Sequence, residues 1–398
     1  MPQQPPIEFD ADENDSPKAS LVELAQVFLR LGFLAFGGPA AHIAMMDEEV
    51  VQRRRWLSRE KLLDLLGVTN LIPGPNSTEL AIHIGYEQAG VAGLMVAGAC
   101  FILPAMVIVW LLAMAYVRYQ AVPQVDWLLY GVKPVILAVI IQALYKLGQK
   151  ALKDRPTIIA AVGVVIAAAL GGPEIGLILL AGLGILLWKT GRRPSHPLQG
   201  LWFFPPTFLS IPTSSVGPNM ASTGQVFLYF LKIGSVLYGS GYVLLAFLQR
   251  DLVERLGWLT SQQLLDAIAI GQVTPGPVFT TATFIGYLLA GNSGALAGTI
   301  GIFLPSFVFV FVVHPWVTAL RKSVRFSAFL DGVNAASLGL MAVVTFVLAR
   351  SALVDSLTII LAGGSALVLF RFKVNSAWLV LAGGAIGLLT RLMTVKPL

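Results

Sequence analysis

Two Pro-Gly-Pro segments carry the residues whose types and spacing could do chemistry. In the first, Pro73-Gly74-Pro75 is followed directly by Asn76, Ser77, Thr78 and Glu79. Proline and glycine break the preceding helix, and a proline suits the first position of a new one. A helix that begins there presents free backbone N–H groups and the positive end of its dipole, which attract anions. The segment therefore predicts an anion site, to which the side chains of residues 76–78 add amide and hydroxyl groups.

The second segment, Thr274-Pro275-Gly276-Pro277, stands at the equivalent place of the second half of the chain and is followed by Thr280. It predicts a second helix N-terminus. Two such N-termini that face each other near the middle of a membrane are typical of anion sites in transporters. The alternative is a structural kink with packing glycines, which are common in membrane helices.

Three basic residues in apolar surroundings are candidates for binding the anion. Arg30 and Lys232 are 202 positions apart, and Lys133 has the neutral Asn334 at the equivalent place. Basic residues inside a membrane are costly and mark functional sites by default, although a long side chain can instead reach the interface. Arg30 and Lys232 each precede a glycine-rich break, and we include these breaks in the candidate site: Gly37, Gly38, Gly239, Ser240 and Gly241.

Two titratable residues without an equivalent in the second half are candidates for proton coupling. His42 and Glu79 align with Leu244 and Thr281. Intramembrane groups that can gain or lose a proton are common in proton-coupled transport. Either residue could equally be a structural polar group.

The composition identifies the kind of elements that hold these residues. Of the 398 residues, 56% are hydrophobic and 12% are charged, whereas a soluble domain has about 25% charged residues. The uncharged stretches Val91–Val117 and Gly294–Val313 are long enough to span ~30 Å of hydrocarbon. An ordinary soluble enzyme and a disordered chain are excluded, and an all-α polytopic membrane protein is predicted. The net charge of +6 then reflects basic loops at an anionic membrane face rather than binding to nucleic acid.

A repeat organises the chain. Trp56-Leu57 and the first Pro-Gly-Pro recur 202 positions later, and Gly85-Tyr86 recurs after a one-residue deletion as Gly286-Tyr287. Chance similarity between hydrophobic helices would not keep this constant offset. We therefore divide the chain into a polar N-terminal tail (residues 1–20), a first transporter repeat (21–190), a Pro-rich linker (191–224) and a second transporter repeat (225–398).

Each half is expected to contain the same series of helices, one of which is broken at Pro-Gly-Pro. The ranges are Leu21–Phe36, Leu62–Ala89, Val91–Val117, Trp127–Leu147, Pro156–Leu170 and Glu174–Trp188, then Gln225–Tyr238, Leu264–Ala290, Gly294–Val313, Ala328–Ala349, Val354–Phe370 and Ser376–Thr390. The bias of Lys and Arg in equivalent loops alternates and is opposite between the halves; the Arg53–Lys61 loop, for example, holds five basic residues and its counterpart two. This pattern predicts inverted-topology repeats with about ten crossings and two re-entrant, broken helices.

The absence of other motifs narrows the chemistry. The sequence has no P-loop, no His-Glu-x-x-His and no Gly-x-Ser-x-Gly motif, and it has one cysteine, Cys100. We therefore expect no enzymatic activity, no cofactor and no metal site. Residues Met1–Ser20 lack the basic start and apolar core of a cleavable signal peptide.

Four segments carry a resemblance to a known family: Phe36-Gly37-Gly38-Pro39-Ala40-Ala41-His42, Pro73–Glu79, Gly239-Ser240-Gly241-Tyr242 and the second Pro-Gly-Pro. With these segments the chain resembles the chromate ion transporter family in its long-chain, two-domain form. The resemblance spans about residues 21 to 390. It implies a multi-pass secondary transporter of the bacterial inner membrane that exports chromate, a tetrahedral dianion whose charge two helix N-termini, Arg30 and Lys232 could match.

Several alternatives stay open at this point. Sulfate has nearly the same shape and charge as chromate, and the driving force could be a proton gradient or exchange against another anion. An anion channel and a membrane-embedded assembly protein are the competing classes. The expected partners are chromate or sulfate and membrane lipids, with a homodimer as an open alternative and no nucleic acid.

Overall fold

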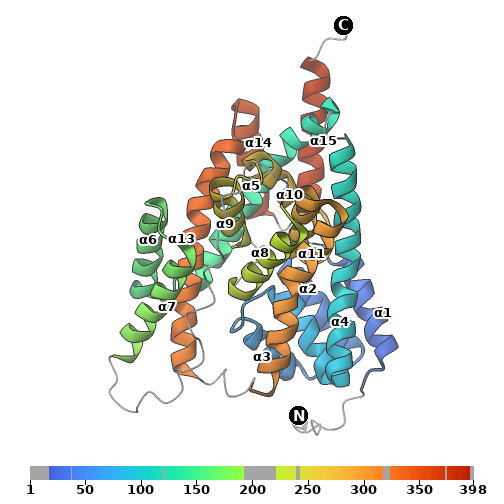
Figure 1. The fold of residues 1–398 in the computed structure, drawn as a ribbon, viewed down its shortest axis with the longest axis vertical. Coiled ribbons are helices and arrows are strands. Elements are labelled where there is room, and N and C mark those ends of the chain that lie inside the picture. Colours follow the sequence, from blue (N-terminus) through green and yellow to red (C-terminus); the bar gives the residue numbers. More distant parts are fainter. Residues whose placement is uncertain are drawn as a thin grey trace, which may run out of the picture.

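The computed structural model describes residues 18–36, 38–119, 122–191, 221–238, 243–316, 323–372 and 374–394. Throughout these ranges the regular elements are helices, as the sequence predicts (Figure 1). Four of them are long and apolar enough to cross a membrane: α4, α5, α11 and α13. The chain is therefore an all-α polytopic membrane protein, and the number of crossings stays a prediction.

The two halves contain corresponding helices in the same order, and the second half has two additional 3-10 turns. The first half consists of α1 (Leu21–Leu34), α2 (Pro39–Met46), the π-helix η1 (Asp47–Arg53), α3 (Arg59–Thr69), α4 (Asn76–Tyr119), α5 (Pro123–Ala151), α6 (Arg155–Ala169) and α7 (Glu174–Thr190). The second consists of α8 (Thr223–Val236), α9 (Leu244–Leu248), the π-helix η3 (Gln249–Arg255), α10 (Ser261–Val273), the 3-10 turn η4 (Val278–Thr280), α11 (Thr281–Val313), the 3-10 turn η5 (His314–Trp316), α13 (Val324–Ala352), α14 (Ser356–Arg371) and α15 (Ser376–Thr394).

Local sequence signals explain most of these boundaries. Ser20 and Ser222 form capping boxes at the starts of α1 and α8, and Asp154 and Asp355 do so at α6 and α14. A capping box satisfies two backbone N–H groups that the first helical turn leaves free. The helices between residues 39 and 53, and between 244 and 255, are absent from the predicted ranges because they are short and carry clustered charges.

Both α4 and α11 are helical hairpins rather than straight helices. Gly90 and Gly291 have φ angles of 57° and 62° at the turns. On either side of the turn, Gly85 packs so closely on Gly93 that a Cβ atom at Gly85 would overlap the Gly93 carbonyl, and Gly286 packs on Gly294 in the same way. Each Pro-Gly-Pro segment is therefore followed by a short half-helix, a tight turn and a long helix that runs back beside the half-helix. In the first half this turn lies at the break predicted near Ala89.

The long helices α5 and α13 lie beside each other and run antiparallel (Figure 1). Tyr130, near the start of α5, donates a hydrogen bond to Asp355, just beyond the end of α13. Lys153, just beyond the end of α5, donates to Asp331, near the start of α13, at 2.7 Å. Equivalent helices of the two halves thus run in opposite directions.

The last two helices of each half pack on the long helix of the other half. Helices α6 and α7 contact α13, and α14 and α15 contact α5. Equivalent glycines make these contacts possible: a Cβ atom at Gly131 of α5 would lie 2.8 Å from the backbone nitrogen of Gly387, and one at Gly332 of α13 would lie 2.8 Å from the Cα atom of Gly182. The halves are interlocked through these four helices.

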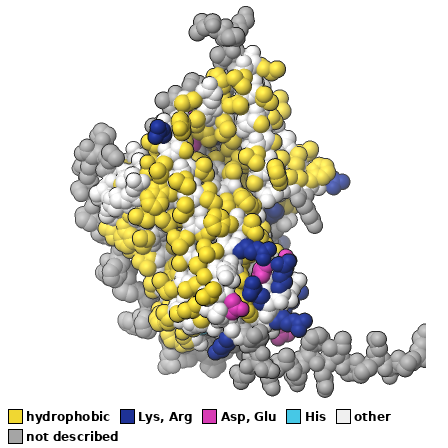
Figure 2. Space-filling model, turned by 90° about the vertical axis from the view of Figure 1, so that its right-hand side faces the viewer, with side chains coloured by type: hydrophobic (Ala, Val, Ile, Leu, Met, Phe, Trp, Pro, Cys, Tyr) yellow, Lys and Arg dark blue, Asp and Glu magenta, His cyan; other side chains and the backbone are white. Residues whose placement is uncertain are grey.

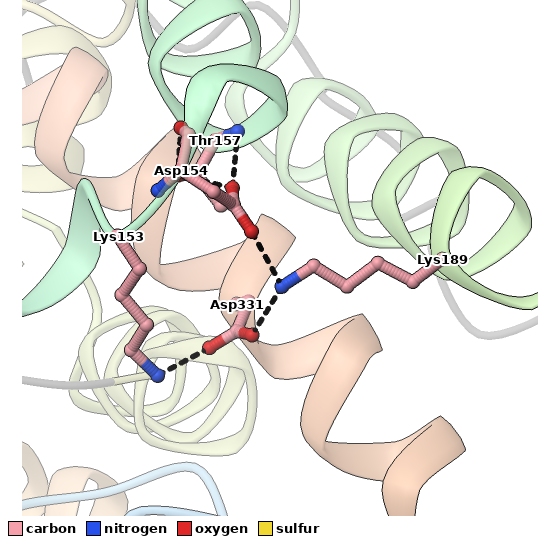
Figure 3. Close-up of polar contacts among 5 residues, drawn as sticks. All are labelled: Lys153, Asp154, Thr157, Lys189 and Asp331. Atoms are coloured by element: carbon pink, nitrogen blue, oxygen red, sulfur yellow. Dashed lines mark hydrogen bonds and ion pairs between the residues drawn. The ribbon is translucent and has the colours of Figure 1, made fainter.

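A charged cluster reinforces one of these contacts (Figure 3). Asp331 lies between Lys153 and Lys189, with Nζ–Oδ distances of 2.7 and 2.9 Å, and Lys189 also pairs with Asp154 at 3.0 Å. The cluster joins the α5–α6 connection and the end of α7 to α13, and therefore holds the first half against the second.

The outer surface is suited to lipid. Figure 2 shows one side of the molecule, where hydrophobic side chains cover most of the described surface and Lys and Arg side chains gather in its lower part. The exposed side chains include Leu111, Ile159, Val162 and Phe346. So large an apolar surface is expected of a chain that faces hydrocarbon rather than water.

Candidate functional site

The two Pro-Gly-Pro segments meet at the interface between the halves. The backbone N–H of Gly74 donates to the carbonyl oxygen of Leu237 at 2.8 Å, and the N–H of Gly276 donates to that of Ala35 at 3.0 Å. Ala35 and Leu237 are equivalent residues that follow α1 and α8. Each break is therefore tied to the opposite half by the same bond, and the two bonds form a reciprocal pair.

His42 connects the two breaks. Its side chain is 1% exposed, its Nδ1 atom lies 3.1 Å from the Ser77 hydroxyl, and its Nε2 atom lies 3.0 Å from the Ala35 carbonyl oxygen. Ser77 belongs to the first turn after Pro75, and the Ala35 carbonyl also accepts the Gly276 N–H. The ring packs edge-on against Phe101. His42 thus links the N-terminus of α4 to the second Pro-Gly-Pro segment.

Glu79 lies buried against the first break without a hydrogen-bonding partner among the described residues. The residue is 0% exposed, and both of its carboxylate oxygens lack a bond, as do the hydroxyls of Thr78 and Ser306. Gly74 has a φ of 144°, and a Cβ atom there would overlap Glu79 Oε1 and lie 2.5 Å from the Ser306 hydroxyl. A buried carboxyl group is stable only when it is protonated or paired with a cation. These surroundings therefore favour the neutral carboxylic acid at Glu79, and its role in proton coupling stays a prediction.

Other predicted polar residues near the breaks have bonds of their own. Asn76 donates to the side chain of Asn70 at 2.7 Å. The hydroxyls of Thr274 and Thr280 donate to backbone carbonyls of their own segment, those of Gly271 and Pro277, at 3.3 and 2.8 Å. The second segment also continues as η4 before α11 begins at Thr281, whereas α4 begins directly at Asn76. The two N-termini are therefore similar in place but different in local geometry.

The three candidate cations are in different surroundings. The Arg30 side chain is 58% exposed and pairs with Glu49 at 3.3 Å, and Glu49 also pairs with Arg53 and Arg54. Lys133 is buried against Asp266 at 3.0 Å, and Asp266 accepts a further bond from the Tyr116 hydroxyl at 2.9 Å. Lys232 is partly buried and has no carboxylate within 4 Å in the part of the chain that the structure describes. Their roles in anion binding stay predictions, and Lys232 has the charge that is least compensated by described residues.

The glycine-rich breaks are described only in part. Gly38 has a φ of 79° and caps α2, which begins at Pro39. The positive φ explains the need for glycine at this position. Gly37, Gly239, Ser240 and Gly241 lie outside the described residues, as does most of the predicted linker.

Sequence reasoning did not single out several polar residues of this region. Ser306 comes from α11, and Tyr238 lies within electrostatic reach of Glu79 from the end of α8. His83, Glu87 and His314 form a further cluster, with 2.9 Å between the Nδ1 atoms of His83 and His314. The spacing of Glu79, His83 and Glu87, four residues apart on one helix, is the signal that could have revealed part of this cluster.

Comparisons with known proteins match both halves of the chain. A family model described as Chromate transporter matches residues 22–188 and again residues 224–388. The chain is 32% identical over 391 residues to the "Chromate transport protein" of Cupriavidus metallidurans, which covers 97% of this chain and 96% of that protein. It is 33% identical over 390 residues to the "Chromate transport protein" of Pseudomonas aeruginosa, covering 93% and 92%. The "Probable chromate transport protein" of Synechococcus elongatus is 33% identical over 347 residues, covering 85% and 87%. No solved structure matches the chain significantly.

Proposed function

The chain belongs to the chromate transporter family and is a membrane transporter rather than an enzyme, and from this premise we propose that it exports chromate from the bacterial cytoplasm across the inner membrane. A dianion that leaves a cytoplasm held at negative potential gains about 4.6 kcal/mol per 100 mV, which is twice the energy of a single charge. Export therefore has a driving force even without a second substrate. The long relatives that are named as chromate transport proteins support the choice of substrate.

The anion site in this proposal lies between the two Pro-Gly-Pro segments. The observation that carries it is the reciprocal pair of bonds from Gly74 to Leu237 and from Gly276 to Ala35. Both N–H groups face a carbonyl of the opposite half, so a relative movement of the halves would free two donors at once. Chromate oxygens would accept these donors, together with the unbonded Thr78 hydroxyl, and Lys232 would supply positive charge.

Glu79 provides a reason for proton coupling. A dianion next to an ionised, buried carboxylate would be strongly repelled, because Coulomb energies are large where water is excluded. Chromate therefore binds when Glu79 is protonated. His42, which links Ser77 to the Ala35 carbonyl, is placed to sense the same change.

We further propose that the halves are inverted repeats, each of which contributes one break to the site. The antiparallel course of α5 and α13 supports this arrangement. The contacts of α4 with α11 also agree with an inverted arrangement. The turn of the first hairpin lies near the end of α11, where Tyr86 packs beside His314. The turn of the second hairpin lies near the later part of α4, where Trp110 bonds to Asn292. Cysteine labelling should place the Arg53–Lys61 and Asp251–Gln262 loops on opposite sides of the membrane. Labelling of both loops from the same side would contradict the inverted arrangement.

The transport proposal is tested by radiotracer flux of chromate and of sulfate into inside-out membrane vesicles, with and without a pH gradient. We expect saturable chromate uptake that unlabelled chromate suppresses. Equal rates for sulfate would make the protein a general oxyanion transporter. Flux that does not saturate would identify a channel, and the absence of flux would refute the proposed function.

A further inference from the structure

A line of four titratable side chains leads from the surface of the molecule to the buried His83, one helical turn from Glu79 in α4. Lys61 Nζ lies 2.8 Å from Glu87 Oε1, and the same oxygen lies 3.2 Å from His314 Nε2. His314 Nδ1 lies 2.9 Å from His83 Nδ1. The exposed fraction falls steadily along the line, from 34% at the Lys61 side chain through 22% and 11% at Glu87 and His314 to 0% at His83.

His83 and Glu79 stand one helical turn apart on α4. Residues at i and i+4 share one face of a helix, and a helical side chain leans toward the preceding turn, so the His83 ring lies on the side of Glu79. His83 Nε2 and both Glu79 oxygens are buried atoms without a hydrogen-bonding partner among the described residues. Buried polar atoms are normally paired, and here the unpaired atoms are a base and an acid at neighbouring positions.

We propose that His83, His314 and Glu87 form a proton relay between Glu79 and the surface at Lys61, a route that rests on the transport function proposed above. The relay lies at the junction of the two halves, because His83 and Glu87 belong to α4 and His314 follows α11. Its members have no titratable equivalents in the repeat, where Leu288 and Ala113 stand at the positions of Glu87 and His314. The relay therefore opens toward only one end of the molecule.

One choice of tautomers gives a continuous path for a proton. In it His83 Nδ1–H donates to His314 Nδ1 and His314 Nε2–H donates to the Glu87 carboxylate, which leaves His83 Nε2 as a free acceptor. Glu79 and His83 Nε2 share no hydrogen bond in this structure, so the first transfer follows a side-chain rotation that brings them within hydrogen-bonding distance. A proton that then leaves Glu79 for His83 Nε2 displaces the Nδ1 proton to His314, and the Nε2 proton of His314 passes to Glu87. Glu79 ends as a carboxylate, Glu87 ends as a carboxylic acid, and both histidines stay neutral. Glu87 then loses one proton to water beside Lys61, and the reverse sequence reloads Glu79.

The surroundings of the relay contain few competing charges. His83 faces His314 and Glu87, and Glu87 faces Lys61 and His314. His314 also packs against the ring of Tyr86, with 4.2 Å between centroids. Glu79 faces Ser306 and Tyr238. Charged residues on other helices that contact α4 have partners elsewhere, as shown by the Arg30–Glu49 and Lys133–Asp266 pairs.

The relay is tested by two measurements on purified protein in lipid vesicles. Net efflux of labelled chromate requires that the empty site change its protonation in every cycle, whereas equilibrium exchange of labelled against unlabelled chromate does not. We expect His83→Gln and His314→Gln to lower net efflux by about 100-fold, the usual contribution of a positioned proton-transfer group, and to leave exchange unchanged. His196→Gln in the linker and Glu60→Gln on the exposed start of α3 are the matched controls and should leave both measurements unchanged.

A second comparison separates a relay from a structural role. Glu79→Gln holds the site neutral, so adding His83→Gln to that variant should have no further effect on net efflux. The relay would be overturned if the histidine variants lowered net efflux and exchange by the same factor. It would also be overturned if His83→Gln lowered net efflux further in the Glu79→Gln background. Absence of exchange in the wild-type protein would instead refute the proposed transport function, so the two failures are distinguishable.

Discussion

Gly74 offers the sharpest test of the paired Pro-Gly-Pro structure. Alanine at this position would have to keep a φ of 144° and would place a Cβ atom 2.5 Å from the Ser306 hydroxyl, while overlapping the Glu79 carboxylate. A positive φ costs a residue with a Cβ atom roughly 1–2 kcal/mol. Loss of the Gly74–Leu237 hydrogen bond adds about 1 kcal/mol. The sum of about 2–3 kcal/mol corresponds to a fall of ~30- to 150-fold in the population of the paired state.

The repeat itself supplies the control. Gly257 also has a positive φ, of 62°, but a Cβ atom there would meet nothing within 4 Å. Its equivalent in the first half is Arg55, which adopts a φ of 55° with a full side chain. Gly257→Ala should therefore cost only backbone energy and leave transport near the wild-type rate.

The assay is chromate flux in vesicles that contain equal amounts of each variant, measured beside thermal unfolding of the purified protein. Gly74→Ala should lose at least ten times more transport than Gly257→Ala, because only the first change places a Cβ atom against Glu79 and Ser306 at the proposed site. Gly276→Ala should resemble Gly74→Ala, since a Cβ atom there would lie 2.7 Å from that of Ala105. Equal transport by the Gly74 and Gly257 variants would refute the idea that the paired breaks form the site.

Three further predictions follow from the site and from the interlocked helices. Lys232→Gln should raise the concentration of chromate needed for half-maximal flux by about tenfold. Arg30→Gln should raise that concentration less, because Arg30 already pairs with Glu49. A larger effect of Arg30→Gln would indicate that Lys232 lies at the membrane interface and does not bind chromate. Thr78→Ala should weaken chromate binding by ~1 kcal/mol in calorimetry, and Thr280→Ala by less, because the Thr280 hydroxyl already donates to Pro277; an equal loss for both would argue against Thr78 as a donor. Burial acts to raise the pKa of Asp154, but hydrogen bonds from Lys189 and Thr157 outweigh it and lower that pKa. The stabilisation from Asp154 should therefore be complete above its ordinary pKa of about 3.9 and disappear as the pH falls through the lowered value; thermal unfolding of wild type and Asp154→Asn should converge at acid pH, and a constant difference would contradict this role.

The long helices could be predicted closely from the sequence, because proline, glycine and capping residues mark their ends, whereas the short helices between residues 39 and 53 and between 244 and 255 were missed. The break near Ala89 and the one at Pro73–Pro75 were both expected, and the constant 202-residue offset revealed which segments correspond. Each Pro-Gly-Pro segment bonds to the opposite half, and the anion site between the segments stays a prediction. The offset also contained an unrecognised clue, since Ala35 and Leu237 are equivalent positions whose carbonyls accept the paired bonds.

The partners of the charged residues could not be predicted in the same way. Lys133 and Asp266 are 133 positions apart, and His83 and His314 are 231 apart. Their contacts depend on how helices of the two halves face each other, which is set by small residues such as Gly131 and Gly332 that have no distinctive local pattern. For the same reason, one sequence did not reveal that Arg30 turns toward Glu49 at the surface rather than toward the breaks.

The interlocking of the two halves has a consequence for biosynthesis. Gly131 leaves the ribosome 252 residues before Gly383, the residue that it packs against. At a synthesis rate of about 5–20 residues per second, this face of α5 waits roughly 10–50 s for its partner. During that interval the face of α5 around Gly131 is without its partner, and it can be covered only after α15 has entered the membrane. Insertion and final packing of α5 are therefore separate events, and the second waits until α15 has been made and inserted.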